Sequence, residues 1–366
     1  MEKVINVPLY KPPILKEAQE ALNKCFLSGW WGYGSACREL ENRFTVNRGG
    51  WALATSSCTS ALYVIARLLK HTPNSEVIVP SITWVSSAMA FLAAGYKVKV
   101  ADISPENLMI NVETIKSVIT KNTKAVVVVH LYGQKANIKE ISEYCKTNGI
   151  TLIEDCAHRI DIENIPYADY CCYSFNTVKE IPCGEGGMIW CRKMEEEEQA
   201  RAISYLGMEV NTWQRTSVTK HRDLIFSNST GLKLQLNDLS ASIANIMCEY
   251  KESAKIRRKN IFNVYNEHLQ ELNTKVNLLQ RTTEDSFLMY VISLNNVNRE
   301  ILREQLASVG ISTSVHYPSL SSHPLIEKSN TPIGDSLSRN ILTLPCYPDI
   351  SIDEQIAVVN ALKKYL

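Results

Sequence analysis

The chain has 366 residues, of which 45% are hydrophobic and 21% are charged, a composition typical of globular proteins. This length exceeds what a single hydrophobic core usually accommodates, so we expect a large domain and a smaller one. The 39 Lys and Arg residues balance 38 Asp and Glu residues, and the formal net charge is +1. Such a balance gives no electrostatic reason to expect binding to nucleic acid or to an anionic membrane.

The N-terminal sequence MEKVINVPLYKPPILKEAQ lacks the apolar segment of a signal peptide. No stretch approaches the roughly 20 apolar residues that a helix needs to span a bilayer. The 11 cysteines, an odd number, indicate reduced thiols and a cytoplasmic protein. Because no two of them form a CxxC pair, we expect no zinc site, no redox dithiol and no bound metal.

Short β-branched runs alternate with longer helical patterns between about residues 50 and 195. Strands are predicted at 76–80, 97–103, 124–131, 150–155, 169–175 and 187–192, and helices at 83–94, 111–120 and 137–148. This alternation predicts an α/β fold with a parallel sheet covered by helices on both faces.

The pattern changes beyond about residue 235. A long helix is predicted from Asn237 and Asp238 through Tyr265, followed by strands at 287–294 and 311–316. A last helix is predicted at 352–365, with Asp349 and Ser351 as candidate caps. We therefore expect a large domain at 1–245 and a small α+β domain at 246–366, and the N-terminal segment could pack on the small domain or on a partner.

The first motif with chemical content is TSSCTSAL at 55–62, which is followed by an apolar helical pattern. Small hydroxyl residues at the start of a helix satisfy its free N–H groups, and the helix dipole there favours an anion. The motif is consistent with a phosphate site, but on this stretch alone simple capping of the helix is the favoured interpretation.

The second motif is ITLIEDCAH at 150–158, a strand that ends in two acidic residues. Ligands of open α/β folds bind at the carboxyl edge of such strands. Because successive side chains of a strand point to opposite faces, Glu154 and Asp155 cannot both face one site. A buried carboxylate here could hold a protonated heterocyclic nitrogen, and His158 could either adjoin it or be an ordinary loop histidine.

The third motif is SFNTVKEIPCGEGG at 174–187, which places Lys179 between a strand end and a glycine-rich turn. An amine that forms a Schiff base must lose its proton, and burial or nearby cations can lower a lysine pKa to roughly 7–8. The glycines let the backbone approach a ligand or adopt positive φ, although GEGG alone could be a tight turn.

These three motifs, in this order and spacing, resemble the DegT/DnrJ/EryC1/StrS family of sugar aminotransferases. The segment around Lys179 is similar to the family pattern SFxxxKxxxxGEGG, and further blocks such as PSITWVSSAMAFLAAGYKVKVADI and VHYPSLSSHPLI extend the resemblance over nearly the whole chain. The resemblance implies fold type I of the pyridoxal-phosphate enzymes: a large domain with a mostly parallel seven-stranded sheet between helices, and a smaller α+β domain.

The resemblance also implies roles for individual residues. Lys179 would bind pyridoxal 5'-phosphate as a Schiff base and shuttle the proton during transfer, and Asp155 would pair with the ring nitrogen. Trp84, which would otherwise be assigned to core packing, would lie flat on the ring, and His158 would sit near the ring hydroxyl. The residues implied to hold the phosphate are Thr59, Ser60 and Ser174.

The sequence departs from the family at several positions. Lys233 stands where an asparagine usually reaches the phosphate in a neighbouring subunit, so a homodimer with shared active sites is implied, with a lysine in that role. After CAH the family usually continues with a small residue, a glycine and a longer loop, whereas this chain reads RIDIENIPYADY, which is shorter and has no glycine. Arg159 and Asp161 in this segment could alter the substrate side of the pocket. The resemblance places four further residues near the substrate: Trp30, Tyr33, His316 and Tyr317.

The resemblance implies transfer of an amino group from glutamate to a keto-sugar. A nucleotide-linked sugar is the first candidate for the substrate. The run WWGYG at 30–34 resembles the cyclitol and aminobenzoate branch of the family, which implies a keto-cyclitol and glutamine as the alternative. Aromatic faces suit both kinds of ring, and these residues could also be a packed anchor across the dimer. Family members that catalyse dehydration carry histidine in place of the cofactor lysine, so Lys179 favours transamination over a dehydratase. A non-enzymatic regulator on the same fold is a further alternative, against which the lack of a basic patch argues.

Overall fold

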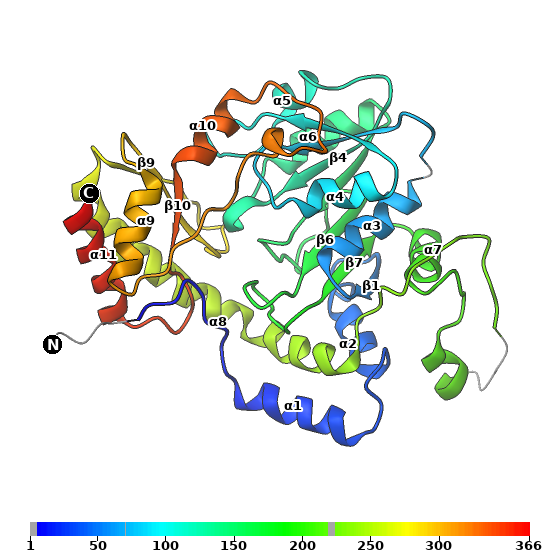
Figure 1. Cartoon of the computed structure of the whole chain (residues 1–366). Helices are drawn as coiled ribbons and strands as arrows, with labels where there is room; N and C mark the ends of the chain where they lie inside the picture. Colours follow the sequence, from blue (N-terminus) through cyan, green and yellow to red (C-terminus); the bar gives the residue numbers. More distant parts are fainter. Residues whose placement is uncertain (1–5, 70, 219–223) are drawn as a thin grey trace.

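The computed structural model describes residues 6–69, 71–218 and 224–366. A seven-stranded sheet forms the centre of the larger part of the molecule (Figure 1). Its strands in spatial order are β1 (Trp51–Thr55), β7 (Gly187–Cys191), β6 (Tyr170–Ser174), β5 (Thr151–Asp155), β4 (Thr123–Val129), β2 (Glu76–Pro80) and β3 (Lys97–Ala101).

The central sheet is mostly parallel, as the alternating pattern predicts. β3, β2, β4, β5 and β6 run parallel to one another, whereas β7 pairs antiparallel with both β6 and β1. β2, β6 and β7 are buried at every position, which explains their continuous apolar sequences. β1 was not predicted, because its sequence WALAT contains two alanines and no Val or Ile.

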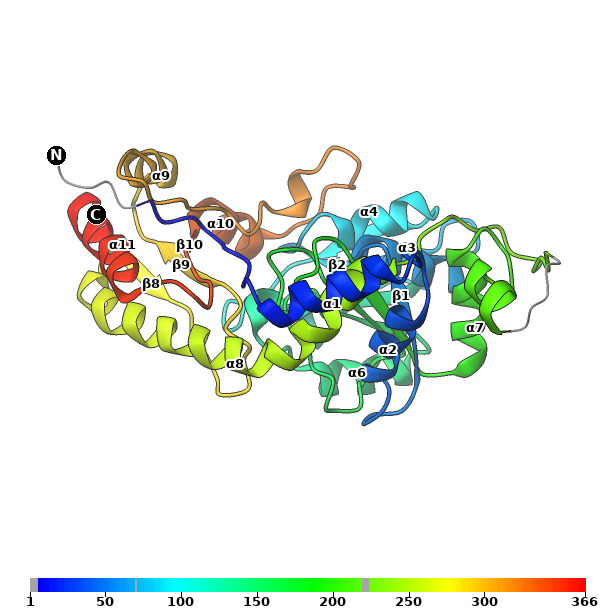
Figure 2. The same ribbon diagram turned by 90° about the horizontal axis from the view of Figure 1, so that it is seen from below.

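Helices cover both faces of this sheet. Figure 2 shows α3 (Cys58–Leu68) and α4 (Ser86–Ala93) on one side, with α6 (Ile138–Thr147) and α2 (Ser35–Arg43) on the other. The predicted helices at 83–94 and 111–120 are shorter in the structure, where α5 spans only Val112–Lys116. The other helical segments of this part are α1 (Lys16–Leu27), α7 (Met194–Ser204), η1 (Leu131–Gly133) and η2 (Gln214–Val218).

The long helix α8 (Asp238–Leu269) joins the two parts of the molecule (Figure 1). The side chain of Asn237 caps its first turn by accepting a hydrogen bond from the N–H of Ser240, at 2.9 Å. The predicted boundary at 245/246 falls inside α8. The apolar residues of its first half belong to the core around the central sheet, whereas those of its last turns belong to a second core.

The second core surrounds a three-stranded antiparallel sheet. Its strands are β10 (Ile341–Leu344), β9 (Tyr290–Leu294) and β8 (Val276–Leu278), and its helical segments are α9 (Arg299–Ser308), α10 (Pro332–Asn340), α11 (Ile352–Tyr365), η3 (Gln270–Leu272) and η4 (Leu320–Ser322). Val7 is fully buried in this core, so the N-terminal segment packs here. Ser351 caps α11 through a capping box with Glu354, whereas Asp349 pairs with Arg257 instead.

The strand predicted at 311–316 is wrong, and the strand predicted at 287–294 begins only at Tyr290. The segment 311–316 makes two isolated bridges, one from Ile311 to Val7 and one from Ser314 to Thr343. Each bridge contacts a different segment, so no ladder of consecutive pairs forms. Among the helices of the described residues, none has the length and apolar character needed to cross a bilayer.

Candidate active site

Asp155 is the last residue of β5, at the carboxyl edge of the parallel strands, and it is almost fully buried. Its Oδ2 accepts a hydrogen bond from the hydroxyl of Ser87 at 2.8 Å, and its Oδ1 accepts one from the N–H of Ala157 at 3.0 Å. Glu154 points to the other face, where its carboxylate meets the ring of His130 at 2.9 Å. The two neighbouring carboxylates are therefore separated, as strand alternation predicts.

Burial raises the pKa of Asp155 above its ordinary value, because the charged form loses its water. The hydrogen bonds from Ala157 and Ser87 and the positive charge of Lys179 oppose this shift. The carboxylate therefore depends on these donors and charges to stay ionised. A cationic ring nitrogen placed against it would add to the same effect.

Lys179 lies in the loop between β6 and β7. The loop is held by backbone hydrogen bonds from Lys179 to Asn176 and from Thr177 to Gly184, and Gly184 has φ +96°, a conformation that favours glycine. Burial lowers the pKa of Lys179 to about 8, although the charges of Asp155 and Cys58 act in the opposite direction. Within residues 6–69, 71–218 and 224–366, the amine of Lys179 has no hydrogen-bond or ion-pair partner. A substantial fraction of this amine is neutral near pH 8, and its lone pair is not engaged by the protein.

His158 is buried and its two ring nitrogens have different partners. Nδ1 accepts a hydrogen bond from the N–H of Tyr132 at 3.2 Å, which leaves the proton of the neutral ring on Nε2, 2.9 Å from the hydroxyl of Tyr317. Burial, together with the charges of Lys179 and His316, holds the pKa of His158 well below its ordinary value. The ring is therefore a neutral group that is fixed in one orientation.

Two aromatic side chains form a wall beside these groups. The rings of Trp84 and Tyr317 lie 5.5 Å apart, and Trp84 is 56% exposed, although it is a large apolar residue. His316 precedes Tyr317, binds the hydroxyl of Thr343 at 2.8 Å, and has its pKa lowered to about 4, by burial first and by the charge of Lys179 second. An exposed indole facing this cluster is available to cover a planar ring.

The N-terminus of α3 lies against the start of β7. Gly187 makes this approach possible, because a Cβ at this position would lie 2.4 Å from the backbone carbon of Ser57 and 2.5 Å from the nitrogen of Cys58. The side chain of Ser57 caps the helix by accepting from the N–H of Ser60. Thr59 is exposed, and in the described part of the chain its N–H has no acceptor, so the helix start can bind an anion.

Ser174 and Lys233 both lie close to this helix start. Ser174 is brought there by strand pairing and Lys233 by a backbone hydrogen bond of its neighbour. Ser174 is buried at the end of β6, directly opposite Gly187 in the sheet. Lys233 is exposed, and the carbonyl of the next residue accepts a hydrogen bond from the N–H of Ser56 at 2.6 Å. Ser174 and the backbone next to Lys233 therefore lie near the N-terminus of α3, and the phosphate contacts predicted for these residues stay predictions.

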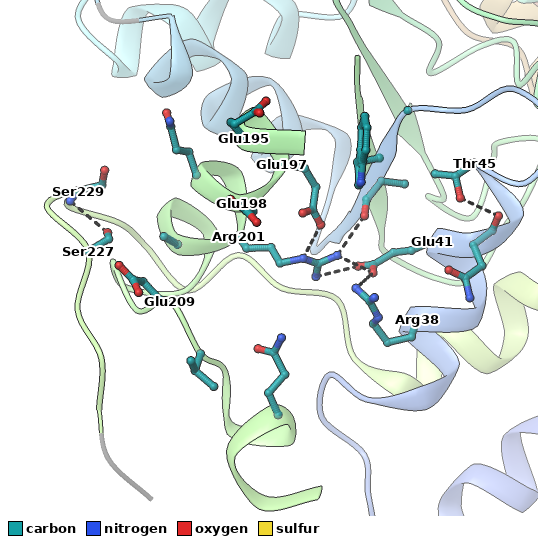
Figure 3. A pocket seen from close by; sticks show the side chains of 18 residues that line it. Arg38, Glu41, Thr45, Glu195, Glu197, Glu198, Arg201, Glu209, Ser227 and Ser229 are labelled. Atoms are coloured by element: carbon teal, nitrogen blue, oxygen red, sulfur yellow. Dashed lines mark hydrogen bonds and ion pairs between the residues drawn. The ribbon is translucent and has the colours of Figure 1, made fainter. Parts of the chain in front are cut away.

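The structure engages the hydroxyl of Tyr33 in an ion-pair network, and the contact of Tyr33 with substrate stays a prediction. Tyr33 is only 7% exposed, and its hydroxyl is held by the carboxylate of Glu41 at 3.0 Å and by Arg201 at 2.6 Å. Figure 3 shows Arg201 and Arg38 both directed at Glu41, beside a cavity of about 890 Å³ that none of the residues around Lys179 lines. The hydroxyl of Tyr33 therefore takes part in a buried ion-pair network that stabilises the fold.

Trp30, Arg159 and Asp161 line cavities outside the cluster around Lys179, whereas His316 and Tyr317 lie beside His158. Trp30 is half-buried and donates its indole N–H to the carbonyl of Tyr33 at 3.1 Å, in a cavity of about 490 Å³ next to the start of α8. Arg159 and Asp161 line a different cavity of about 420 Å³, together with Glu180 and Lys251. Neither cavity includes Lys179 or Asp155 among its lining residues.

Sequence analysis did not identify two residues that contact the cluster, Ser87 and Tyr132. Tyr132 has φ +57° within η1, and its N–H and hydroxyl reach His158 and the carbonyl of His316. Ser87 follows Ser86 at the start of α4, and only the three-dimensional fold decides which of two adjacent serines faces inward. A positive φ at a tyrosine cannot be predicted from sequence, and neither can the inward orientation of Ser87. Neither residue therefore carried a signal in the sequence.

Comparison with known proteins agrees with this geometry. Residues 12–363 match the DegT/DnrJ/EryC1/StrS aminotransferase family, and the chain belongs to it. An uncharacterised protein of Methanocaldococcus jannaschii, MJ1066, is 28% identical over 98% of this chain and 97% of its own length.

Two solved structures share the fold. PseC of Helicobacter pylori, an aminotransferase involved in the biosynthesis of pseudoaminic acid, is 20% identical, with a TM-score of 0.89 over 99% of each chain. Spr1654 of Streptococcus pneumoniae, described as a sugar aminotransferase and solved in its PLP form, is 22% identical, with a TM-score of 0.88 over 99% of this chain and all of its own.

The fold and the family define this chain as a pyridoxal-phosphate-dependent aminotransferase of fold type I. The residues present fit that cofactor. The chain offers an unpartnered amine of lowered pKa, a buried carboxylate, an exposed indole and a helix start whose N–H groups are available to a phosphate. This donor set matches the aldehyde, ring nitrogen, ring face and phosphate of the cofactor.

Proposed function

We propose that this enzyme transfers the amino group of glutamate to the carbonyl carbon of a nucleotide-linked keto-sugar. The proposal rests mainly on the environment of Lys179. Burial lowers the pKa of its amine, and the charge of Asp155 acts on the same amine in the opposite direction. The names of PseC and Spr1654, both connected with sugars, support the substrate class. Lysine at position 179 is also the residue type that transamination requires.

In this proposal, bound pyridoxal phosphate supplies an electron-accepting ring that takes up negative charge from the reacting carbon. Asp155 binds the ring nitrogen and keeps it positively charged. The amine of Lys179 would take a proton from one carbon of the reacting molecule and return it to another. Positioned proton transfer of this kind contributes roughly 10²–10⁴-fold to the rate.

The proposal assigns the remaining residues to binding. Trp84 covers one ring face, and neutral His158 lies near the ring hydroxyl, fixed by Tyr132 and Tyr317. His316 and Tyr317 border the substrate. The residues proposed to hold the phosphate are Thr59, Ser60, Ser174 and, from a second subunit, Lys233.

A substrate screen tests the reaction. Purified enzyme is incubated with keto-sugar nucleotides and keto-cyclitols, each with glutamate or glutamine, and the amino product is measured by mass spectrometry. We expect an amino-sugar nucleotide with glutamate and none from the Lys179→Ala variant. Amination of cyclitols alone, with glutamine as donor, would replace the sugar assignment by the alternative.

The same assay separates the other classes. A half-reaction with glutamate alone should convert the absorbance of the bound cofactor to that of its amine form and release 2-oxoglutarate. A dehydratase would instead lose water from the sugar and leave no amine on the product. A protein that acts only as a regulator would give neither signal.

The proposed dimer is supported by exposed apolar residues next to Lys233. Their exposed fractions lie between 46% and 65%, and the residues are Leu206, Leu224, Ile225, Phe226 and Leu232. Sedimentation equilibrium should give twice the 41.2 kDa chain mass. Lys233→Ala should weaken cofactor binding without changing that mass, and a monomeric, active protein would contradict the shared site.

The proposed compartment is the reducing cytoplasm. All 11 cysteines are free thiols, and nine of them are buried in the structure.

A further inference from the structure

Three buried polar side chains form a chain that ends on Asp155. The hydroxyls of Thr83 and Ser87 lie 3.0 Å apart, and the hydroxyl of Ser87 lies 2.8 Å from Oδ2 of Asp155. Thr83 is 2% exposed, Ser87 is fully buried and Asp155 is 4% exposed. Hydrogen bonds in such surroundings are stronger than in water, because water does not compete for them.

The direction of these hydrogen bonds follows from which of the three groups has a proton to donate. An ionised carboxylate only accepts, so Ser87 must give its single hydroxyl proton to Asp155. The contact between Thr83 and Ser87 can then form only if Thr83 donates to the oxygen of Ser87. Both dipoles therefore point toward the carboxylate, and each strengthens the next.

The same turn also carries the exposed indole of the site. Trp84 lies between Thr83 and Ser87 in sequence, and its carbonyl accepts a hydrogen bond from the N–H of Ser87 at 3.1 Å. Ser87 thus binds the carboxylate with its side chain and the backbone of Trp84 with its main chain. One residue connects the two groups assigned to the edge and the face of the cofactor ring.

We propose that Ser87, supported by Thr83, is a positioning residue that holds Asp155 ionised and correctly oriented for the ring nitrogen. The proposal rests on the role proposed above for Asp155. Ser87 fixes Oδ2 while the N–H of Ala157 fixes Oδ1, so the plane of the carboxylate is set by donors on both oxygens. Without Ser87 the carboxylate can rotate about its last torsion angle.

The ion pair with the ring needs this donor because both partners are buried. A proton between a carboxylate and a pyridine nitrogen can lie on either group. A hydrogen bond to the carboxylate stabilises the charged form and keeps the proton on the ring nitrogen. Loss of that hydrogen bond favours the neutral pair, in which the ring accepts negative charge poorly.

The test uses apoprotein and holoenzyme of Ser87→Ala, with Ser87→Thr as the conservative variant and Ser86→Ala as the matched control. Ser86 is adjacent and half-buried, and its side chain makes no hydrogen bond within the described ranges of the chain. The dissociation constant of pyridoxal phosphate is measured by titration of apoprotein. The absorbance maximum of bound cofactor, which shifts with the protonation state of the cofactor, is measured at fixed pH.

A buried hydrogen bond to a charged group contributes enough to change affinity about 10- to 100-fold. We therefore expect Ser87→Ala to weaken cofactor binding about tenfold or more, to shift the absorbance maximum and to lower kcat. Ser87→Thr should restore all three quantities, and Ser86→Ala should match the parent. Thr83→Val keeps the shape of the side chain and removes the donor. It should change cofactor affinity, the absorbance maximum and kcat in the same direction as Ser87→Ala, but less.

Two outcomes separate this inference from the proposed function. If Asp155→Asn impairs the enzyme while Ser87→Ala matches the parent in affinity and absorbance, Asp155 acts without Ser87 and the inference is overturned. If Asp155→Asn itself has normal affinity, absorbance and kcat, the role of Asp155 is wrong. A fall in thermal stability of Ser87→Ala with unchanged affinity and absorbance would make Ser87 merely structural and would also overturn the inference.

Discussion

The amine of Lys179 differs from that of an exposed lysine because burial removes water from its charged form. Its pKa falls to about 8, from an ordinary value of 10.5. The neutral amine is the form that attacks an aldehyde, and its population rises as pH increases through the pKa. The rate at which apoprotein captures pyridoxal phosphate should therefore rise with pH and level off with a midpoint near 8.

Stopped-flow absorbance measures this rate between pH 6 and roughly pH 10, a window chosen to cover the lowered pKa. The Lys179→Ala variant serves as the baseline, since it lacks the amine. A rate that keeps rising across this window without levelling off would show that the pKa of Lys179 stays near its ordinary value of 10.5 and that burial does not perturb it.

Glu154 and Asp155 are adjacent and chemically alike, yet the fold gives them different tasks. Asp155→Asn should lower kcat by about 10² or more, because the ring loses its charged partner. Glu154→Gln should leave kcat within a few-fold and lower the free energy of unfolding by about 1 kcal/mol, since its buried contacts to His130 and Ala168 lose charge assistance. Steady-state kinetics and urea unfolding of both variants check this contrast, and equal kinetic effects would refute it.

At the scale of elements, the contact between β7 and α3 depends on Gly187. A Cβ there would lie within 2.6 Å of three backbone atoms of Ser57 and Cys58, which flexible side chains cannot relieve. Gly187→Ala should lower the free energy of unfolding by about 1–3 kcal/mol and weaken phosphate binding, because the helix start must move away. Gly32→Ala is the matched control, since a Cβ at Gly32 meets nothing within 4 Å.

Urea unfolding and titration with pyridoxal phosphate measure the two effects. If Gly187→Ala and Gly32→Ala were equally stable and bound the cofactor equally, the close approach would not hold the site together.

The elements of the central sheet were predictable because their sequences repeat a simple physical pattern. The positions of all six strands predicted between residues 76 and 192 agree with the structure within two residues, and three of them, β2, β6 and β7, are buried at every position. β1 was not predicted, because alanine has little preference for strands. The strand at 311–316 was predicted wrongly because its apolar pattern reflects contacts with Val7 and Thr343 on different segments, which no local pattern reveals.

Some of the site residues could also be predicted, because they belong to local sequence patterns. Lys179, Asp155 and the start of α3 lie in local motifs whose chemistry can be read from sequence. The contacts of Tyr33 could not be predicted, because an aromatic run does not disclose that a buried carboxylate and Arg201 engage its hydroxyl. Ser87 was missed because its partner is 68 residues away in the chain.

At the scale of the whole molecule, α8 contributes to two separate cores. Ala241, Ala244 and Met247 pack with the central sheet, whereas Phe262 and Tyr265 pack around the three-stranded sheet. We propose that these cores define two domains that share α8, with the N-terminal segment of Val7 belonging to the second. His316 and Tyr317 come from the C-terminal part and meet His158 of the larger part, so the site needs both.

The central claim is that Lys179 binds the cofactor covalently. Holoenzyme is treated with borohydride, which reduces a carbon–nitrogen double bond to a stable link, and is then digested and analysed by peptide mass spectrometry. We predict one pyridoxyl-phosphate adduct, located on Lys179 and absent from Lys179→Ala. An adduct on another lysine, or intact holoenzyme with no adduct at all, would contradict the account.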